Sequence, residues 1–258
     1  MKPKVVVYVF PGTNSEDETK RALEASGVDV ALVRSDDTTD AAKKADGYVL
    51  PGGFAHEDRI RAGAVAAHDR AMDVVIEAAG KGKPVLGICN GAQVLLESGL
   101  VPGTSHVRRP SAAFAPNIPG GRFRCVHIYM RLMIPPARSA LLAALPKDAV
   151  IPAWVAHGEG RLAASFEELA RVEHDHLAFA YCDPNGDVSP EVIPNGSALG
   201  AAGLINKGGN VLAIMPHPER DAWAFMHRYD LIPAKTAREA LRPSGGIALI
   251  QSFAKAFA

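Results

Sequence analysis

The sequence predicts an α/β fold in which a mostly parallel sheet carries helices on both faces. Apolar runs typical of strands buried on both sides recur in the first part of the chain, at residues 5–10, 28–33, 47–50 and 84–88. Segments with helical signals separate these runs, and this alternation is typical of parallel sheets. Glycine-rich turns at 51–54 and 87–91 follow strand ends, where ligands bind in such sheets.

Helices are expected in the segments between these strands. Ser15 and Glu18 form a capping-box pattern that opens a helix ending near Gly27. A longer helix is predicted over 58–79, with glycines after it as a stop signal. A further helix is predicted over 90–98, directly after the fourth strand.

The second part of the chain is less regular. Residues 101–118 lack periodicity and are predicted to form a long loop. Strand-like segments follow at residues 123–134, 151–156, 177–181, 198–205 and 211–215, and a terminal helix is expected at 247–257. No break in composition marks a boundary, so we expect one domain over residues 1–258.

Composition excludes several classes of function. The 258 residues carry 28 Lys plus Arg and 28 Asp plus Glu, so charge gives no reason to expect nucleic acid or a membrane as partner. Cys89, Cys125 and Cys182 form neither a disulfide framework nor a zinc pattern, which predicts a reducing, cytoplasmic location. No apolar run approaches the roughly 20 residues of a membrane span.

The run Gly87-Ile88-Cys89-Asn90-Gly91 has the form of a nucleophile elbow with cysteine at its centre. An apolar strand precedes it, a helix follows, and small residues flank the centre, as a strained turn requires. A lone cysteine after a core strand is more often a buried structural residue. The elbow context reverses that expectation, and a helix N-terminus favours a thiolate nucleophile.

A nucleophilic cysteine needs a base and a group that orients the base. His217 and Glu219 lie two residues apart, and Pro216 and Pro218 keep this segment out of a helix. A polar turn after a strand is the alternative interpretation. The chain order, with the nucleophile first and the histidine last, favours a catalytic pair.

The other histidines carry weaker signals. His157 lies in a small-residue loop after a strand and is a second candidate for the site. His174 and His176 flank Asp175, where a solvated loop is more common than a metal site, so no metal is expected. Residues 80–83 lack the spacing of a phosphate-binding loop, and nothing recognisable for binding ATP is present.

Together these segments resemble the class I (triad) glutamine amidotransferases, and within them the glutaminase subunits that serve de novo purine biosynthesis. The most specific elements are Cys-Asn-Gly-x-Gln, Ala-His-Gly-Glu-Gly and Met-Pro-His-Pro-Glu-Arg. The matching segments are residues 9–14, 51–54, 61–64, 82–93, 99–103, 156–160 and 209–220. The resemblance implies a flavodoxin-like fold and hydrolysis of L-glutamine to glutamate and ammonia.

The resemblance also implies roles for single residues. Cys89 is expected as the nucleophile, His217 as the base and Glu219 as its orienter. The residues expected to bind substrate, through oxyanion amides or the glutamine itself, are Gly52, Gly53, Asn90 and Gln93. The chain departs from the family's usual pattern at residues 55–59, at Val126 and in a longer segment at 221–243.

No cofactor is expected in this chain. The resemblance implies that ammonia passes to a separate ATP-dependent synthetase subunit, which holds ATP and Mg²⁺ and makes an amidine from formylglycinamide ribonucleotide. A small accessory subunit is a further candidate partner. Loops at 56–61, 108–121 and 157–161 are the expected docking surface, and they carry charged residues and glycines rather than a broad apolar face.

Two other interpretations remain open at the level of sequence. The chain could be a different triad amidotransferase or a stand-alone cysteine amidase of similar fold. It could also be a non-catalytic module that keeps the fold for binding. A degenerate module is expected to lose Cys89, His217 or Glu219, and all three are present.

Overall fold

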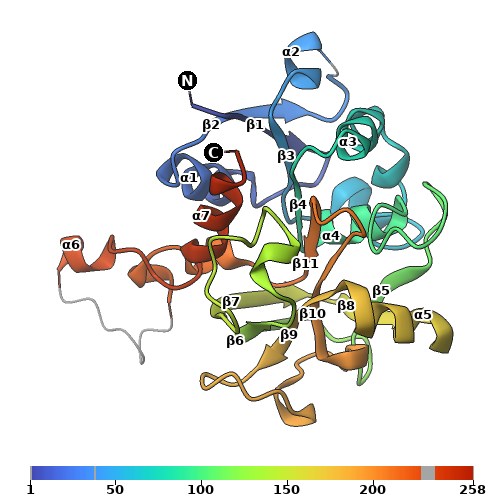
Figure 1. Cartoon of the computed structure of the whole chain (residues 1–258), viewed down its shortest axis with the longest axis vertical. Helices are drawn as coiled ribbons and strands as arrows, with labels where there is room; N and C mark the ends of the chain where they lie inside the picture. The colour runs from blue at the N-terminus through green and yellow to red at the C-terminus, as the bar shows by residue number, and fades with distance from the viewer. Residues whose placement is uncertain (1, 38, 228–235, 258) are drawn as a thin grey trace.

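The computed structural model describes residues 2–37, 39–227 and 236–257. Within these ranges, a nine-stranded mixed sheet runs through the molecule in the order β2-β1-β3-β4-β11-β10-β9-β6-β7 (Figure 1). A second, two-stranded sheet pairs β5 with β8. Its strand β5 lies inside residues 101–118, so our prediction of a continuous loop there was wrong.

The first half of the large sheet is parallel. Its strands are β1 (Lys4–Val9), β2 (Asp29–Arg34), β3 (Gly47–Leu50), β4 (Val85–Ile88) and β11 (Val211–Ile214). The predicted strands differ from them by one residue or less at each end. β1, β3, β4 and β11 are almost wholly buried, since helices cover both faces. The predicted α/β class is confirmed.

In the second half of the sheet, neighbouring strands are antiparallel. Its strands are β6 (Arg124–Leu132), β7 (Val150–His157), β9 (Leu177–Cys182) and β10 (Ala201–Ile205), and the small sheet holds β5 (Ala112–Pro116) and β8 (Glu159–Ala164). All four antiparallel strands of the large sheet, β6, β7, β9 and β10, were predicted as strands. β8 was not, because its small, mixed residues carry no alternation of apolar and polar side chains.

Helices lie on both faces of the parallel half (Figure 1). On one face α1 (Glu16–Ala25) packs against α7 (Ile247–Lys255), and on the other lie α3 (Arg70–Gly80) and α4 (Asn90–Glu97). The other described α-helices are shorter: α2 (Asp40–Lys43), α5 (Phe166–Arg171) and α6 (Ala237–Ala240). No helix in the described ranges has the length and apolar character needed to cross a membrane.

The predicted helix over 58–79 was wrong in its first half. Helix α3 begins only after Asp69, whose carboxylate accepts the N–H of Arg70. The chain before it is irregular, with positive φ at Asp58 and Ile60. Gly63 explains part of this, because its φ is +80° and a Cβ there would lie 2.7 Å from the backbone of Gln93. Close packing on α4 therefore outweighs the local helical signal.

The predicted capping box at Ser15 does not form. Helix α1 begins after Ser15, but the Ser15 hydroxyl makes no bond to the helix N–H groups. It accepts a hydrogen bond from the Arg220 guanidinium at 2.8 Å instead. Ser15 therefore does not cap α1, and its hydroxyl connects the start of the chain to Arg220 in the segment after β11.

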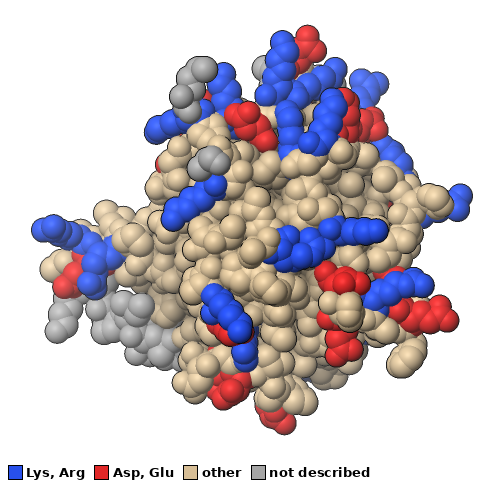
Figure 2. Space-filling view, in the orientation of Figure 1, with Lys and Arg blue, Asp and Glu red and all other residues tan. Residues whose placement is uncertain are grey.

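Charges are distributed without a dominant sign. On the face shown in Figure 2, Lys and Arg side chains gather at the top with Asp and Glu among them, and a few more Lys and Arg side chains lie on the otherwise uncharged middle. This distribution agrees with the zero formal net charge. Residues 228–235, which belong to the longer segment at 221–243, lie outside the described residues.

The turn between β4 and α4 yields a prediction about stability. A Cβ at Gly91 would lie 1.9 Å from the carbonyl oxygen of Leu50. Gly91→Ala should therefore lower the free energy of unfolding by about 1–3 kcal/mol or prevent folding. Gly80, at the end of α3, has nothing within 4 Å of a Cβ, and Gly80→Ala should leave Tm unchanged or raise it. Thermal unfolding of both variants checks this, and an unaltered Tm for Gly91→Ala would contradict it.

Candidate active site

Cys89 stands at a sharp turn between a buried strand and a helix. Strand β4 ends at Ile88 and α4 starts at Asn90, so this one residue makes the turn. Its backbone adopts φ 51° and ψ −108°, which is unusual for a side chain other than glycine. Its N–H donates to the carbonyl of Ile214 on β11 at 2.7 Å. The predicted elbow is therefore present in the structure.

His217 and Glu219 follow the neighbouring strand β11. Both side chains are buried, and His217 Nδ1 donates to Glu219 Oε1 at 2.5 Å. Cys89 lies on the same hollow as His217 and is close enough to raise the pKa of the imidazole, while the Cys89 thiol lies 3.8 Å from the carbonyl of Ala156. Gly52 permits this position of the ring, because a Cβ there would lie 2.5 Å from His217 Cε1. The structure thus brings together the three residues that the sequence proposed as a triad.

The electrostatics of this group favour a charged imidazole. Burial lowers the pKa of His217, but the charges of Glu219 and Cys89 outweigh burial and raise this pKa to about 9. An imidazolium beside the sulfur and the carboxylate is therefore stable at neutral pH. Such a group can hold a thiolate in place and then give its proton to a leaving amine.

His157, the second candidate histidine, has the opposite electrostatics. Its ring is buried and has no hydrogen-bond partner among the described groups. Burial, with the charge of His217 as a second cause, lowers the pKa of His157 to about 3. A ring without a carboxylate partner stays neutral. His217 is therefore the better candidate for acid–base chemistry, and His157 forms part of the wall.

A hollow of about 150 Å³ opens beside the sulfur of Cys89. It is lined by Gly53, Phe54, Asp58, Cys89, Gln93, Phe123, Ala156, His157, Gly158 and Glu159. A smaller hollow of about 80 Å³ touches both Cys89 and His217. The lining combines apolar rings with carboxyl and amide groups, which is typical of a site for a small polar molecule.

The amide side chains predicted to bind substrate lie in a hydrogen-bond network. Asn90 Nδ2 donates to Asp58 Oδ1 and to Gln93 Oε1, both at 2.9 Å. Gln93 Nε2 donates to the carbonyl of Glu159 at 2.5 Å. Gln93 thus lies in the wall of the hollow, as expected, while the Asn90 side chain braces the loop before α3.

Asp58 is a site residue that the sequence interpretation missed. Burial raises the pKa of Asp58 to about 6, the bond from Asn90 opposes this shift, and the nearby Glu159 adds to it. A perturbed carboxyl group in a cleft marks a functional candidate. We had placed Asp58 at the start of a helix. The available signal was its position five residues after the second glycine of Pro51-Gly52-Gly53.

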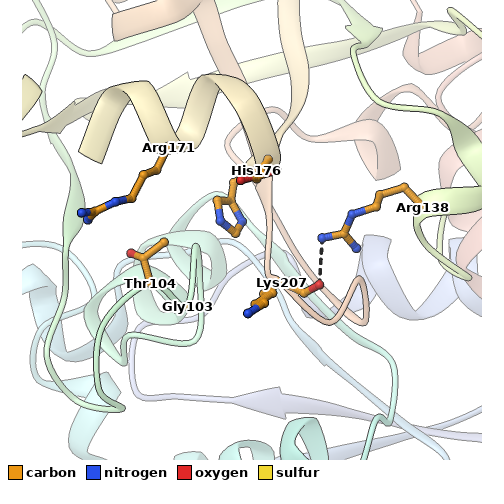
Figure 3. Close-up of a pocket in the computed structure, with 7 residues that line it drawn as sticks. Gly103, Thr104, Arg138, Arg171, His176 and Lys207 are labelled. Carbon is orange, nitrogen blue, oxygen red and sulfur yellow. Dashed lines mark hydrogen bonds between the residues drawn. The ribbon is translucent and has the colours of Figure 1, made fainter. Parts of the chain in front are cut away.

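A more spacious hollow of about 620 Å³ lies elsewhere and offers different chemistry (Figure 3). Arg138, Arg171, His176 and Lys207 surround it, and Arg138 donates to the carbonyl of Lys207 at 2.8 Å. Lys207 follows β10, at the opposite end of β11 from His217. The lining contains no cysteine or serine, so this hollow is a poorer candidate for acyl transfer.

The histidines near this hollow do not converge on one point. His174 is exposed and hydrogen-bonds Asp175, whereas His176 is buried and donates to the carbonyl of Ile205. Their segment continues α5 as one helical turn, Val172–His176, rather than as the solvated loop we predicted.

Comparisons with known proteins agree with this site. The family model described as "CobB/CobQ-like glutamine amidotransferase domain" matches residues 2–243. A curated relative from Methanothrix thermoacetophila, named phosphoribosylformylglycinamidine synthase subunit PurQ, is 38% identical over 243 residues, covering 89% of this chain and 92% of the relative. A relative of the same name from Chlorobium luteolum is 42% identical over 216 residues, covering 83% and 87%.

Among solved structures, a chain from "Structure of PurLQS from Thermotoga maritima" superposes with a TM-score of 0.74. Its sequence identity is 31%, and the match covers 98% of both chains. The expected flavodoxin-like, amidotransferase-type fold is thus supported over nearly the whole chain.

The geometry predicts which cysteine reacts with a glutamine-like affinity label. A diazoketone analogue of glutamine should modify Cys89 alone, because only this sulfur lies beside His217 and the hollow. Cys182 is buried, and burial raises the pKa of its thiol to about 12. Cys125 is exposed and pairs with Ala156 across the sheet, but it does not line either hollow at Cys89. Peptide mass spectrometry locates the adduct. An adduct on Cys125 would refute the assignment.

The raised pKa of His217 also predicts how stability depends on pH. Because the folded-state pKa of about 9 exceeds the usual value of 6.5, the His217–Glu219 pair stabilises the fold fully below pH 6.5 and loses this effect as pH rises through 9. The difference in Tm between the unmodified chain and His217→Gln should therefore shrink from pH 6 to pH 10. A constant difference would show that His217 is not charged in the folded protein.

Proposed function

Since the chain belongs to the CobB/CobQ-like glutamine amidotransferase family, we propose that Cys89, His217 and Glu219 hydrolyse L-glutamine to glutamate and ammonia. The observation that carries this proposal is the contact of His217 with both Cys89 and Glu219 at the carboxyl ends of two parallel strands. The chain is a glutaminase subunit of phosphoribosylformylglycinamidine synthase, which acts in purine biosynthesis, as its curated relatives are named.

The reaction proceeds through a thioester. The Cys89 thiolate attacks the side-chain carbonyl carbon of glutamine, and the backbone N–H groups of Asn90 and Gly53 stabilise the oxyanion. His217 gives its proton to the leaving nitrogen, the carbon–nitrogen bond breaks and ammonia departs. His217 then takes a proton from water as the water attacks the thioester, which releases glutamate and restores the Cys89 thiolate beside the charged imidazole.

The walls of the hollow suit glutamine. The carboxyl groups of Asp58 and Glu159 border it and complement the α-ammonium group of the amino acid. Gln93 lies on the same wall and offers an amide to the substrate. The absence of a side chain at Gly52 leaves room for the His217 ring, since a Cβ there would lie 2.5 Å from His217 Cε1.

We propose that the ammonia passes to a separate ATP-dependent synthetase subunit, which holds ATP and Mg²⁺, and that a small accessory subunit joins the complex. The similarity to a chain from PurLQS supports such an assembly. The side chains around the hollow support it too. Phe54 and Phe123 line the hollow and are half exposed, and Ile60 and Ile118, in the expected docking loops, are exposed as well.

The docking loops were expected to carry charged residues and glycines rather than a broad apolar face. Within these loops, Ile60 and Ile118 are exposed apolar side chains. Apolar and aromatic groups are the usual anchors of protein interfaces. We also propose a cytoplasmic location, which is supported by the three free cysteines.

The test is glutamate release with and without the cognate synthetase, its nucleotide and its substrate. Release should rise about tenfold or more on mixing, since a gated site gains its geometry when a partner docks. His217→Ala should abolish release in both conditions, whereas the exposed His174→Ala serves as the matched control and should not alter it. Full activity of the isolated chain, unchanged by the synthetase, would favour a stand-alone cysteine amidase.

A further inference from the structure

A buried polar cluster lies directly behind the catalytic segment. The Asp221 carboxylate, two residues after Glu219, is fully buried. His127 Nε2, on β6, lies 2.7 Å from Asp221 Oδ2, and His227 Nδ1 lies 2.7 and 2.9 Å from its two oxygens. The hydroxyl of Ser244 completes the set at 2.5 Å from Oδ1. None of these residues belongs to the hollow beside Cys89.

Two histidines and an aspartate can hold a metal ion, but the distances favour hydrogen bonds. Zinc bound at 2.0–2.2 Å in a tetrahedral site would separate its ligand atoms by about 3.3–3.4 Å. The imidazole nitrogens lie 2.7 Å from Asp221 Oδ2, which is the length of a charge-assisted hydrogen bond. His127 Nδ1 also lacks a partner among the described groups, whereas a zinc-bound histidine normally donates its second N–H.

The cluster is connected to the base by a second route through the sheet. Trp154 on β7 pairs with His127 on β6. The backbone of Trp154 exchanges two hydrogen bonds with His217, at 2.7 and 3.3 Å. Its indole packs edge-on against His127 at a centroid distance of 5.2 Å and donates to the carbonyl of Met226 at 2.9 Å.

These contacts close a ring. It runs from His217 along the chain to Asp221, across the carboxylate to His127, across the sheet to Trp154, and back by the two backbone bonds to His217. Glu219 lies within the chain part of this ring, which is a single 3-10 turn, Pro218–Asp221. With both ends of the turn tied, the Glu219 carboxylate is held opposite His217 Nδ1.

We propose that Asp221, clamped by His127 and His227, is a positioning residue for the His217–Glu219 pair. It acts through the turn and touches neither glutamine nor Cys89. The inference rests on the proposed glutaminase function and adds to it a reason for the fixed alignment of the base. It also assigns a role to the start of the longer segment at 221–243, which supplies Asp221 and His227 to the cluster, while Ser244 directly follows the segment.

The experiment compares variants that keep or remove one donor at a time. His127→Gln keeps an N–H near the position of Nε2, while His127→Phe keeps the ring shape without it. His227→Asn and His227→Leu form the equivalent pair for Nδ1. The exposed His174→Asn, which also loses a histidine–aspartate contact, is the control. All are assayed in the complex with the synthetase, with Tm measured for each.

We expect kcat for glutamine to fall about tenfold to a hundredfold in Asp221→Asn, His127→Phe and His227→Leu, since small displacements of catalytic groups cost up to that much. KM should stay within about twofold. His127→Gln and His227→Asn should recover most of the activity. The alkaline limb of the rate of Cys89 labelling should move to lower pH in Asp221→Asn, because a displaced Glu219 no longer supports the charged imidazole.

Three outcomes would overturn the inference. In the first, folded Asp221→Asn shows unchanged kcat and an unchanged pH profile. In the second, His127→Gln is as impaired as His127→Phe, so that the N–H is not what matters. In the third, mass spectrometry finds stoichiometric zinc in the purified chain that Asp221→Asn loses. An unmodified complex that releases no glutamate would instead overturn the proposed function, and this inference with it.

Discussion

The parallel pairing of β4 with β11 is the constraint on which the site depends. Ile88 pairs with Ile214, so Cys89 and the segment that carries His217 leave the sheet at the same level. The N–H of Cys89 then bonds Ile214, which fixes the start of the elbow. No loop separates β4 from α4, so the one intervening residue must take a positive φ. A nucleophile in that strained conformation stands clear of the sheet.

The surroundings, rather than the residue type, decide what each histidine can do. His217 and His157 are both buried, and His217 is close enough to lower the pKa of His157. The charges of Glu219 and Cys89 outweigh burial and raise the pKa of His217, whereas His157 has no carboxylate partner and burial lowers its pKa. Two neutral rings would leave Cys89 without a charged partner. The buried Glu219 carboxylate is therefore the feature that distinguishes the base, His217, from His157 in the wall of the hollow.

The sequence was most informative where local chemistry and structure coincide. The elbow at Cys89 is encoded by adjacent small residues, and the His217–Glu219 spacing by alternating prolines, so both were predictable. The segment before α3 was not, because Gly63 packs on α4 and the Asp58 carboxylate turns toward Asn90. Those contacts join residues about thirty positions apart, and no periodicity records them.

The same limit applies to Ser15 and Asp221. Ser15 has the sequence context of a helix cap, yet the nearby guanidinium of Arg220 takes its hydroxyl. Asp221 follows the most specific motif of the chain, but its partners arrive from β6 and from the segments that precede α6 and α7. A carboxylate that gathers donors from three distant segments can be recognised only once the topology is known.

The network around Asn90 occupies amide groups in and around the hollow. The Gln93 side-chain amide donates to the carbonyl of Glu159, and the Asn90 side-chain amide donates to Asp58 and Gln93. Glutamine must exchange with some of these bonds as it enters, and each exchange is close to neutral, since a net hydrogen bond is worth about 0.5–1.5 kcal/mol. The loop that supplies Asp58 also presents Ile60 to solvent. Ile60 and Asp58 belong to one loop, so a partner that covered Ile60 would contact the element that carries Asp58.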